Sequence, residues 1–264
     1  MDMDKIKNIR DIIAGAESAV LAYSGGIDSG LLAVLCHEVL NDRFCAVTVK
    51  SIVLSEKELQ DAVSFAEEKG FRHEIIETDL AEYKEFTENS RNRCYWCKSR
   101  IISIIKDFAR RENIRNIFEA SNMDDLKDFR PGMKAVREQG IIQPFILASV
   151  FKSDIRAYAS YIGLSVHKKP QMACLATRIP YNEIITREKL FMIEQAESHL
   201  NIYGLKNIRV RHHERIARIE VDRDDMPIIL ANSQDIARIF KQLGFMYVTL
   251  DIEGFRSGSM NEAL

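Results

Sequence analysis

Between residues 18 and 166, short apolar runs alternate with longer segments whose apolar residues recur at helical spacing. This alternation predicts parallel strands joined by crossover helices, which is a doubly wound α/β sheet. The predicted strands cover residues 19–23, 45–49, 73–76 and 117–120. Of the predicted helices, one opens with the capping box Ser55 to Glu58 and ends at Gly70, one follows Lys98, and one covers 153–162.

The C-terminal part of the chain, after Pro180, has a different pattern. It predicts a helix at 186–199, strands at 208–211 and 217–221, a helix at 233–243 and a strand at 247–250. This order is typical of a small α+β domain that is separate from a parallel sheet. We therefore expect two domains, residues 1–180 and residues 181–264.

The bulk composition agrees with two modest domains, because 264 residues with 46% hydrophobic content are enough to bury a core in each. The net charge of -2 provides no global field for nucleic acid, so a small acceptor is expected. The acidic start is not a signal peptide, and no apolar run approaches membrane-spanning length. Five unevenly spaced cysteines do not suggest a disulfide framework. The sequence predicts a cytoplasmic protein with reduced thiols.

A glycine loop, Ser24 to Ser29, follows the first predicted strand and leads into a helix. Unpaired backbone N–H groups and the helix dipole make such a junction a site for anions, above all phosphate. Its spelling, SGGIDS, is neither the GxGxxG of dinucleotide-binding folds nor a Walker loop. It resembles the PP-loop of ATP pyrophosphatases, which split ATP into AMP and pyrophosphate while adenylylating an acceptor. An ordinary strand-to-helix turn is the alternative interpretation.

The residues of this loop suit ATP. The backbone amides of Gly25 and Gly26 would approach the phosphates, and the hydroxyls of Ser24 and Ser29 would donate hydrogen bonds to them. An ionised Asp28 has no proton to donate, so Mg²⁺ is its expected partner. We therefore predict ATP and Mg²⁺ as ligands.

Two further polar turns follow predicted parallel strands. Lys50 comes after the second strand, and Asn122 and Asp125 come after the fourth. The carboxyl ends of parallel strands meet at one edge of the sheet, where ligands bind. These three residues are therefore predicted to join the nucleotide site.

Three of the cysteines lie in polar surroundings. Cys94 and Cys97 form a C-x-x-C pair just before a predicted helix, and Cys174 lies before the second domain. Cys36 and Cys45 lie in apolar runs and are predicted to be small buried hydrophobes. The C-x-x-C pair by itself fits a redox dithiol, half a zinc site, cluster ligation or coincidence. Three thiolates together would hold a [4Fe–4S] cluster and leave its fourth iron open to hydrosulfide.

Four segments carry a more specific resemblance: 122–132, 173–181, 209–213 and 253–261. They resemble the LarE family, the PP-loop sulfur transferases that help to build the nickel-pincer nucleotide. The resemblance implies that ATP adenylylates the carboxylates of pyridinium-3,5-biscarboxylic acid mononucleotide, which are then converted to thiocarboxylates. It also implies a homo-oligomer, a hexamer in the family, whose second domain binds the substrate phosphate and mediates assembly.

Members of this family obtain sulfur in two ways. One branch donates the sulfur of a single cysteine, which matches Cys174, and is left with dehydroalanine. The other holds a [4Fe–4S] cluster through three cysteines, and Cys94, Cys97 and Cys174 match that branch, with sulfide or another sulfur donor as a partner. A cluster-dependent tRNA thiolase is a further alternative, although it would need a basic surface. A non-catalytic nucleotide sensor would have no use for the cysteines.

Arginines are expected to bind the charged substrate. Arg209 and Arg211 alternate on a predicted strand, so both face one side, where paired guanidiniums suit phosphate. The resemblance places the substrate phosphate there, and a solvated charge pair on an edge strand is the alternative. The resemblance also places Arg130 and Arg178 beside the site, where they would hold the second carboxylate or the AMP phosphate.

Aromatic and histidine side chains near these motifs carry weaker expectations. His212 and His213 face opposite sides of a strand, which makes a shared metal improbable and favours surface histidines. Tyr95 and Trp96 lie inside the cysteine pair, where they would either shield a cluster from water or simply pack.

Overall fold

The computed structural model describes residues 3–126, 131–168 and 174–256, and it divides into two compact units. The first unit comprises residues 1–80 and 92–171, and the second comprises 81–91 and 172–264. The segment 81–91, which the sequence pattern assigns to the parallel-sheet domain, belongs to the second unit. The main stretch of the second unit begins at residue 172. The predicted domain boundary at residue 180 stays a prediction.

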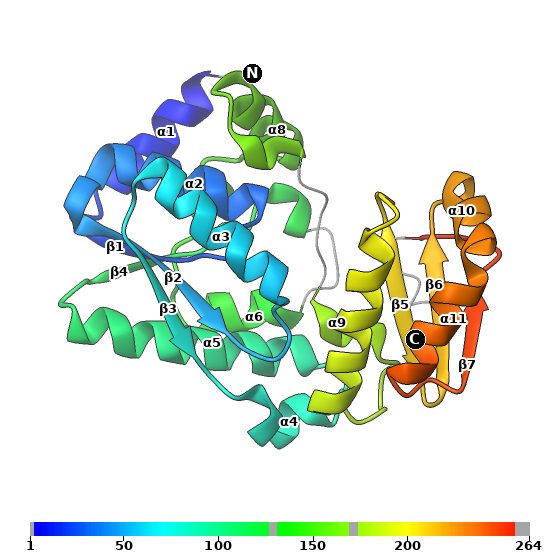
Figure 1. Ribbon diagram of the computed structural model, residues 1–264. Coiled ribbons are helices and arrows are strands. Elements are labelled where there is room, and N and C mark those ends of the chain that lie inside the picture. The colour runs from blue at the N-terminus through cyan, green and yellow to red at the C-terminus, as the bar shows by residue number, and fades with distance from the viewer. Residues whose placement is uncertain (1–2, 127–130, 169–173, 257–264) are drawn as a thin grey trace. The chain divides into compact units, whose positions relative to one another are not determined.

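The first unit is built on a parallel sheet with the strand order β3-β2-β1-β4 (Figure 1). Its strands are β1 (Ala19–Ala22), β2 (Phe44–Lys50), β3 (His73–Glu77) and β4 (Asn116–Phe118). Its α-helices are α1 (Met3–Ala14), α2 (Ile27–Leu40), α3 (Glu56–Lys69), α5 (Arg93–Arg111), α6 (Pro131–Glu138), α7 (Pro144–Leu147) and α8 (Lys152–Tyr161). Short 3-10 helices connect them at η1 (Asn41–Arg43), η3 (Met123–Leu126) and η4 (Ser165–Lys168), and η2 (Leu80–Glu82) leads into the second unit.

Both faces of this sheet are covered, as a doubly wound fold requires. On β1, Leu21 packs in a cluster with α1, α2 and α8, whereas Val20 packs in a second cluster with α5. The alternation follows from the two-residue period of a strand. The predicted α/β sheet is confirmed, as is the burial of Cys36 and Cys45. Burial raises the pKa of both thiols, that of Cys45 to about 12, and keeps them protonated.

Two differences between predicted and observed boundaries bear on the site. The Ser55 to Glu58 capping box begins α3 and the left-handed Gly70 ends it, both where expected. However, α5 begins at Arg93, so Cys94 and Cys97 lie inside its first turns and not before it. The apolar periodicity that predicts this helix starts later in the chain, because its first turns carry the two cysteines, Tyr95 and the exposed Trp96. β4 ends at Phe118, which leaves Glu119 in the following loop.

The second unit contains a mixed sheet with the order β5-β6-β7, antiparallel between β5 and β6 and parallel between β6 and β7. The strands are β5 (Ile208–His213), β6 (Ile216–Val221) and β7 (Tyr247–Leu250). The helices are α4 (Lys84–Thr87), η5 (Leu175–Arg178), α9 (Arg187–Asn201), η6 (Arg223–Asp225), α10 (Met226–Ala231) and α11 (Ser233–Gln242). Apolar residues of α9, α11 and the strands form one core, which confirms a small second sheet with its own interior. In the part of the chain that the structure describes, no helix is both long and apolar enough to cross a membrane.

Candidate active site

The glycine loop of the first unit, residues 24–29, depends on glycine at one position for two reasons. Gly25 has a φ of +70°, the left-handed region, and a Cβ there would lie 2.6 Å from the Cβ of Ala62 on α3. The loop therefore runs closer to α3 than any side chain allows. Ser29 closes the loop, because its Oγ accepts from the backbone N–H of Ser24 at 3.3 Å and lies 3.1 Å from the Ser24 Oγ. Gly26 caps α2 without a side-chain hydrogen bond, as expected of a helix start that faces an anion.

Asp28, the predicted Mg²⁺ ligand, is held by a lysine in this structure. Lys152, at the start of α8, donates to both carboxylate oxygens of Asp28 at 2.7 and 2.6 Å. Burial raises the pKa of Asp28, the charge of Asp125 adds to that effect, and Lys152 opposes it. The sequence analysis missed Lys152, which lies 124 residues away from Asp28. No local pattern connects the two residues.

Lys152 also ties the loop after β4 to this site. Its backbone N–H donates to Asp124 Oδ2 at 2.9 Å, Asp124 N–H donates to Asn122 Oδ1 at 2.9 Å, and Asn122 N–H donates to Asp125 Oδ2 at 2.9 Å. The turn that carries Asn122 and Asp125 is thus fastened to the lysine that holds Asp28. Lys50, in contrast, lies 3.3 Å from Glu77 in an exposed ion pair at the end of β2.

The C-x-x-C pair lies on one end of α5, where Cys94 is exposed and Cys97 is partly buried. The next residue, Lys98, forms an ion pair with Glu119 at 2.9 Å. Burial alone would raise the pKa of Glu119, but Lys98 and the hydrogen bonds from Ser121 lower it to about 2. Trp96 between the cysteines is 44% exposed. It therefore shields little in the first unit taken by itself.

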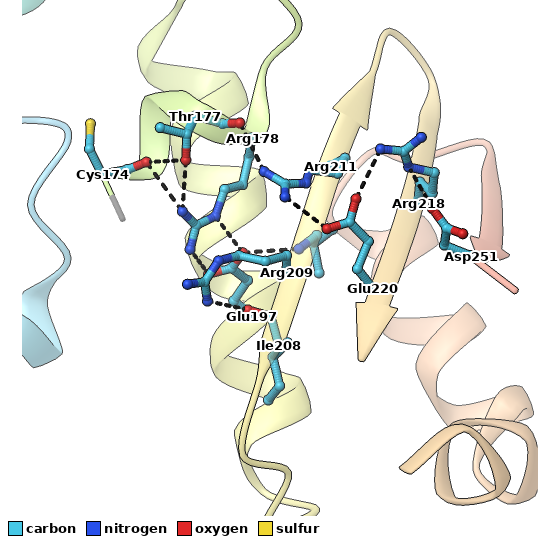
Figure 2. Close-up of polar contacts among 11 residues, drawn as sticks. Cys174, Thr177, Arg178, Glu197, Ile208, Arg209, Arg211, Arg218, Glu220 and Asp251 are labelled. Atoms are coloured by element: carbon cyan, nitrogen blue, oxygen red, sulfur yellow. Dashed lines mark hydrogen bonds and ion pairs between the residues drawn. The ribbon is translucent and has the colours of Figure 1, made fainter. Parts of the chain in front are cut away.

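Cys174 lies in the second unit at the start of η5, and its surroundings are charged (Figure 2). Its carbonyl oxygen accepts from the Thr177 N–H, the Thr177 hydroxyl and Arg178 Nη1, at 2.9, 2.7 and 3.2 Å. Arg178 is 1% exposed and donates to both carboxylate oxygens of Glu197, at 2.8 and 3.1 Å. Arg178 is therefore engaged in holding the cysteine turn against α9, while Cys174 itself stays exposed.

Arg209 and Arg211 share one face of β5, as predicted, but both are buried. Arg211 donates to the Thr177 carbonyl at 3.0 Å and to Glu220 Oε2 at 2.8 Å, and Glu220 also pairs with Arg218 at 2.9 Å. The alternative of a solvated edge pair is wrong, because the turn after Cys174 and a carboxylate of α9 cover this edge. Figure 2 shows the resulting chain of charges.

Arg209 is a further buried cation of this cluster, and the carboxylates of Glu197 and Glu220 act on it. Burial and the charge of Arg178 lower the pKa of Arg209 to about 10, and its guanidinium lies 5.2 Å from the centre of the Phe255 ring. It is still protonated at neutral pH. A guanidinium can bind phosphate through two parallel N–H···O bonds, so Arg209 has the chemistry of the predicted phosphate role.

The expectation of surface histidines is wrong for His212. Its ring is buried on the opposite face of β5, with its centre 5.4 Å from that of Phe245. Burial lowers the pKa of His212 to about 4, so the ring is neutral and serves the core.

Parts of the predicted site are not brought together within one unit. Cys94 and Cys97 belong to the first unit and Cys174 to the second, and Arg130 lies outside the described residues. Among residues 3–126, 131–168 and 174–256, no group of three or more His, Cys, Asp or Glu side chains is placed to hold a metal ion. The described thiols offer the right donors for an iron–sulfur cluster, but each unit supplies only part of the set.

The sheet and its glycine loop define a PP-loop enzyme that uses ATP, and residues 4–108 match the family model of NAD synthase. The pyridinium-3,5-bisthiocarboxylic acid mononucleotide synthase of Lactiplantibacillus plantarum is 33% identical, over 94% of this chain and 90% of that protein. An uncharacterized protein of Synechocystis is 35% identical over 98% of both chains, and one of Methanocaldococcus jannaschii is 33% identical over 90% of both. The chain belongs to the LarE family of ATP-dependent sulfurtransferases.

Proposed function

We propose that this protein activates the carboxylates of pyridinium-3,5-biscarboxylic acid mononucleotide with ATP and replaces them by thiocarboxylates, for the nickel-pincer nucleotide. The observation that carries the proposal is its 33% identity, over 94% of the chain, to a pyridinium-3,5-bisthiocarboxylic acid mononucleotide synthase. Such a reaction needs ATP binding, substrate binding and a source of sulfur. The glycine loop, the buried arginines of β5 and the exposed Cys174 supply these three functions in turn.

Activation comes first, because a carboxylate repels nucleophiles and oxide is a poor leaving group. A substrate carboxylate oxygen attacks the α-phosphorus of ATP, pyrophosphate departs, and an acyl adenylate forms. Sulfide then attacks the acyl carbon, a C–S bond forms, and the C–O bond to AMP breaks. The backbone amides of the glycine loop bind the phosphates, and Lys152 supplies a positive charge next to them.

The Asp28 carboxylate is a hard oxygen donor that suits Mg²⁺. When bound with ATP, Mg²⁺ supplies charge that neutralises the departing pyrophosphate. Asp28 would bind Mg²⁺ in place of Lys152. The Lys152 ammonium group would then be free to bind a phosphate oxygen.

For the sulfur source, the proposal is a [4Fe–4S] cluster held by Cys94, Cys97 and Cys174, with an open iron that carries sulfide. Support comes from cysteine burial: these three are exposed or partly exposed, whereas Cys36 and Cys45 are buried. The donors fit, and Arg178 fixes the backbone of the Cys174 turn. A homo-oligomer completes the proposal and is measured by light scattering.

The test of the cluster is anaerobic purification followed by iron and sulfide analysis and Mössbauer spectroscopy. We expect about four irons per chain in the wild type and a large loss in Cys94→Ala and Cys174→Ala. Cys45→Ala, which removes a buried thiol, is the matched control and should keep its iron. Wild-type protein without iron, prepared anaerobically with iron and sulfide supplied, would reject the cluster.

One observation favours a second candidate, the sacrificial transfer of the Cys174 sulfur. Cys174 lies in the same unit as Arg209 and Arg211, and Arg211 bonds the Thr177 carbonyl within its turn. Mass spectrometry after a single turnover separates the two candidates. Conversion of Cys174 to dehydroalanine supports sacrifice, and an intact thiol supports the cluster.

A further inference from the structure

One buried carboxylate of the first unit, that of Glu119, has no part in the ATP chemistry described above. Glu119 is the first residue after β4 and is 9% exposed. Its Oε1 accepts from Lys98 Nζ at 2.9 Å, and its Oε2 accepts from the Ser121 N–H at 2.9 Å and from Gln143 Nε2 at 3.4 Å. All four residues belong to the first unit. A single side chain therefore joins α5, the turn after β4 and the start of α7.

Both oxygens of Glu119 are needed as acceptors. The end of the Lys98 side chain has only N–H donors, and the Ser121 main-chain group that faces Glu119 is an N–H. Burial alone would raise the pKa of Glu119, but Lys98 and the hydrogen bonds from Ser121 lower it to about 2, so both oxygens are unprotonated. Glutamine has nearly the same shape but one acceptor oxygen. It can accept from Lys98 or from Ser121, but not from both.

The first partner of Glu119 lies at the C-x-x-C end of α5. Lys98 directly follows Cys97 in that helix. Helix α6 packs against the same turns, because a Cβ at Gly132 would lie 3.6 Å from Lys98 Cβ and 3.4 Å from the Cys94 carbonyl oxygen. The first turns of α5 are thus packed by α6 on one side and bonded to Glu119 through Lys98.

The second partner of Glu119 leads to the glycine loop. Ser121 precedes Asn122, whose side chain accepts from the Asp124 N–H. Asp124 in turn accepts from the Lys152 N–H, and the Lys152 side chain donates to Asp28. A continuous series of hydrogen bonds and short chain steps therefore runs from Glu119 to the Mg²⁺ ligand that we propose in the glycine loop.

We propose that Glu119 is a positioning residue for the use of ATP, and that it holds the turn 121–125 of the nucleotide site to the C-x-x-C end of α5. This inference rests on the proposed binding of ATP at the glycine loop. Glu119 acts through Lys98 and Ser121 and not on the reacting atoms. Its loss should weaken ATP binding and loosen both segments together, an outcome that a residue serving stability alone would not produce.

The test begins with calorimetric titration of the full-length protein with Mg²⁺ and α,β-methylene-ATP, an analogue that cannot release pyrophosphate. Glu119→Gln should raise the dissociation constant about tenfold, because the turn loses a hydrogen bond to a charged group or Lys98 loses its partner. Glu112→Gln is the matched control. Glu112 follows the last residue of the same helix and pairs with Arg72 at 2.8 Å, and its loss should change the constant less than about twofold.

A second control separates positioning from stability. Ile105→Ala removes a buried side chain from the middle of α5 and lowers the free energy of unfolding, which urea denaturation measures, yet its dissociation constant should stay within about twofold of the wild type. Hydrogen exchange with mass spectrometry then reports local opening. In Glu119→Gln, the amides of 93–98 and those of 121–125 should both exchange faster than in the wild type, whereas those of α3 should not.

A folded Glu119→Gln that binds the analogue like the wild type would overturn the proposal, and so would an equal loss of affinity in Ile105→Ala. Faster exchange in only one of the two segments would overturn the link between them. If Glu119→Gln does not fold, Glu119→Asp, which keeps the charge on a shorter side chain, is judged by the same criteria. The titration needs neither iron nor the pyridinium substrate, so failure of the sulfur chemistry would leave it readable. A wild type that binds no analogue would reject the ATP site and this inference with it.

Discussion

The glycine loop of the first unit and strand β5 of the second illustrate two ways of preparing a place for an anion. The loop uses backbone: a left-handed Gly25 pressed against α3, and the start of helix α2, where Gly26 has no side chain to cap it. The strand uses side chains: Arg211 is buried and balanced by Glu220, which is itself shared with Arg218. The first arrangement is encoded in six consecutive residues. The second needs partners from other elements, so single substitutions far away in the chain disturb it more easily.

The largest expected effect is a loss of stability when the buried charges of β5 lose their balance. Glu220→Gln removes the charge that balances two arginines at a fully buried position and should lower the free energy of unfolding by about 4 kcal/mol. Glu74→Gln is the control, since Glu74 pairs with Arg72 at 3.0 Å on an exposed surface, and should cost less than about 1 kcal/mol. Urea denaturation measures both. Similar losses would mean that the β5 charges are solvated after all.

The next effect concerns the backbone arrangement. Gly25→Ala places a methyl group 2.6 Å from Ala62 at a φ of +70°, and should cost about 3 kcal/mol and abolish ATP binding. Gly70 has a φ of +72° with nothing within 4 Å of the added Cβ, so Gly70→Ala isolates the conformational cost of about 1 kcal/mol. Thermal melts and ATP titration compare the two. ATP binding by Gly25→Ala would show that the close approach is dispensable.

A smaller effect is the dependence of stability on pH, which tests the burial of His212 on β5. The pKa of His212 is lowered from 6.5 to about 4 in the folded protein, so between these values only the unfolded chain takes up the proton. Its contribution to stability is complete above pH 6.5 and is lost as the pH falls towards 4, amounting to about 2 kcal/mol at pH 5. His212→Gln lacks this loss, and the difference in unfolding free energy between the two proteins should shrink on acidification. A constant difference from pH 8 to pH 5 would contradict the burial of His212.

The smallest predicted effect is on the use of ATP. Lys152→Met removes the cation that holds Asp28, and the ATP concentration for half-maximal pyrophosphate release should rise about tenfold. Lys5→Met removes a comparable ion pair with Asp154, 2.6 Å long, and should change this value less than twofold. Equal responses would show that Lys152 is only structural.

The sequence predicts most of the first unit, because parallel strands and crossover helices have local apolar periods that tertiary contacts seldom override. It fails at the start of α5, where the first turns expose Trp96 and Cys94 and lack the apolar stripe. The sequence pattern also groups 81–91 with the parallel-sheet domain, whereas the bonds that hold this segment join it to residues nearly a hundred positions away.

For the site, prediction works where a motif is contiguous and stops where charges pair over long distances. Ser24 to Ser29 could be recognised from spelling, whereas Lys152 and Glu197 could not. Glu220 is intermediate: β5 and β6 are neighbours in the chain, and Glu220 lies opposite Arg209 in the register, so an antiparallel alignment of the two segments would have found it. The burial of His212 follows from the same alternation that places Arg211 on the other face.

The membership of residues 81–91 in the second unit limits how chimeras between related enzymes can be built. A single crossover near residue 172, which looks like a clean junction, would separate the C-terminal segment from the strip of chain that completes its fold. The carbonyls of Ile179, Pro180 and Glu183 would then depend on a donor supplied by the other parent. A functional chimera between relatives therefore has to carry two pieces, the C-terminal segment and its matching short insert, and inheritance of the two should be linked.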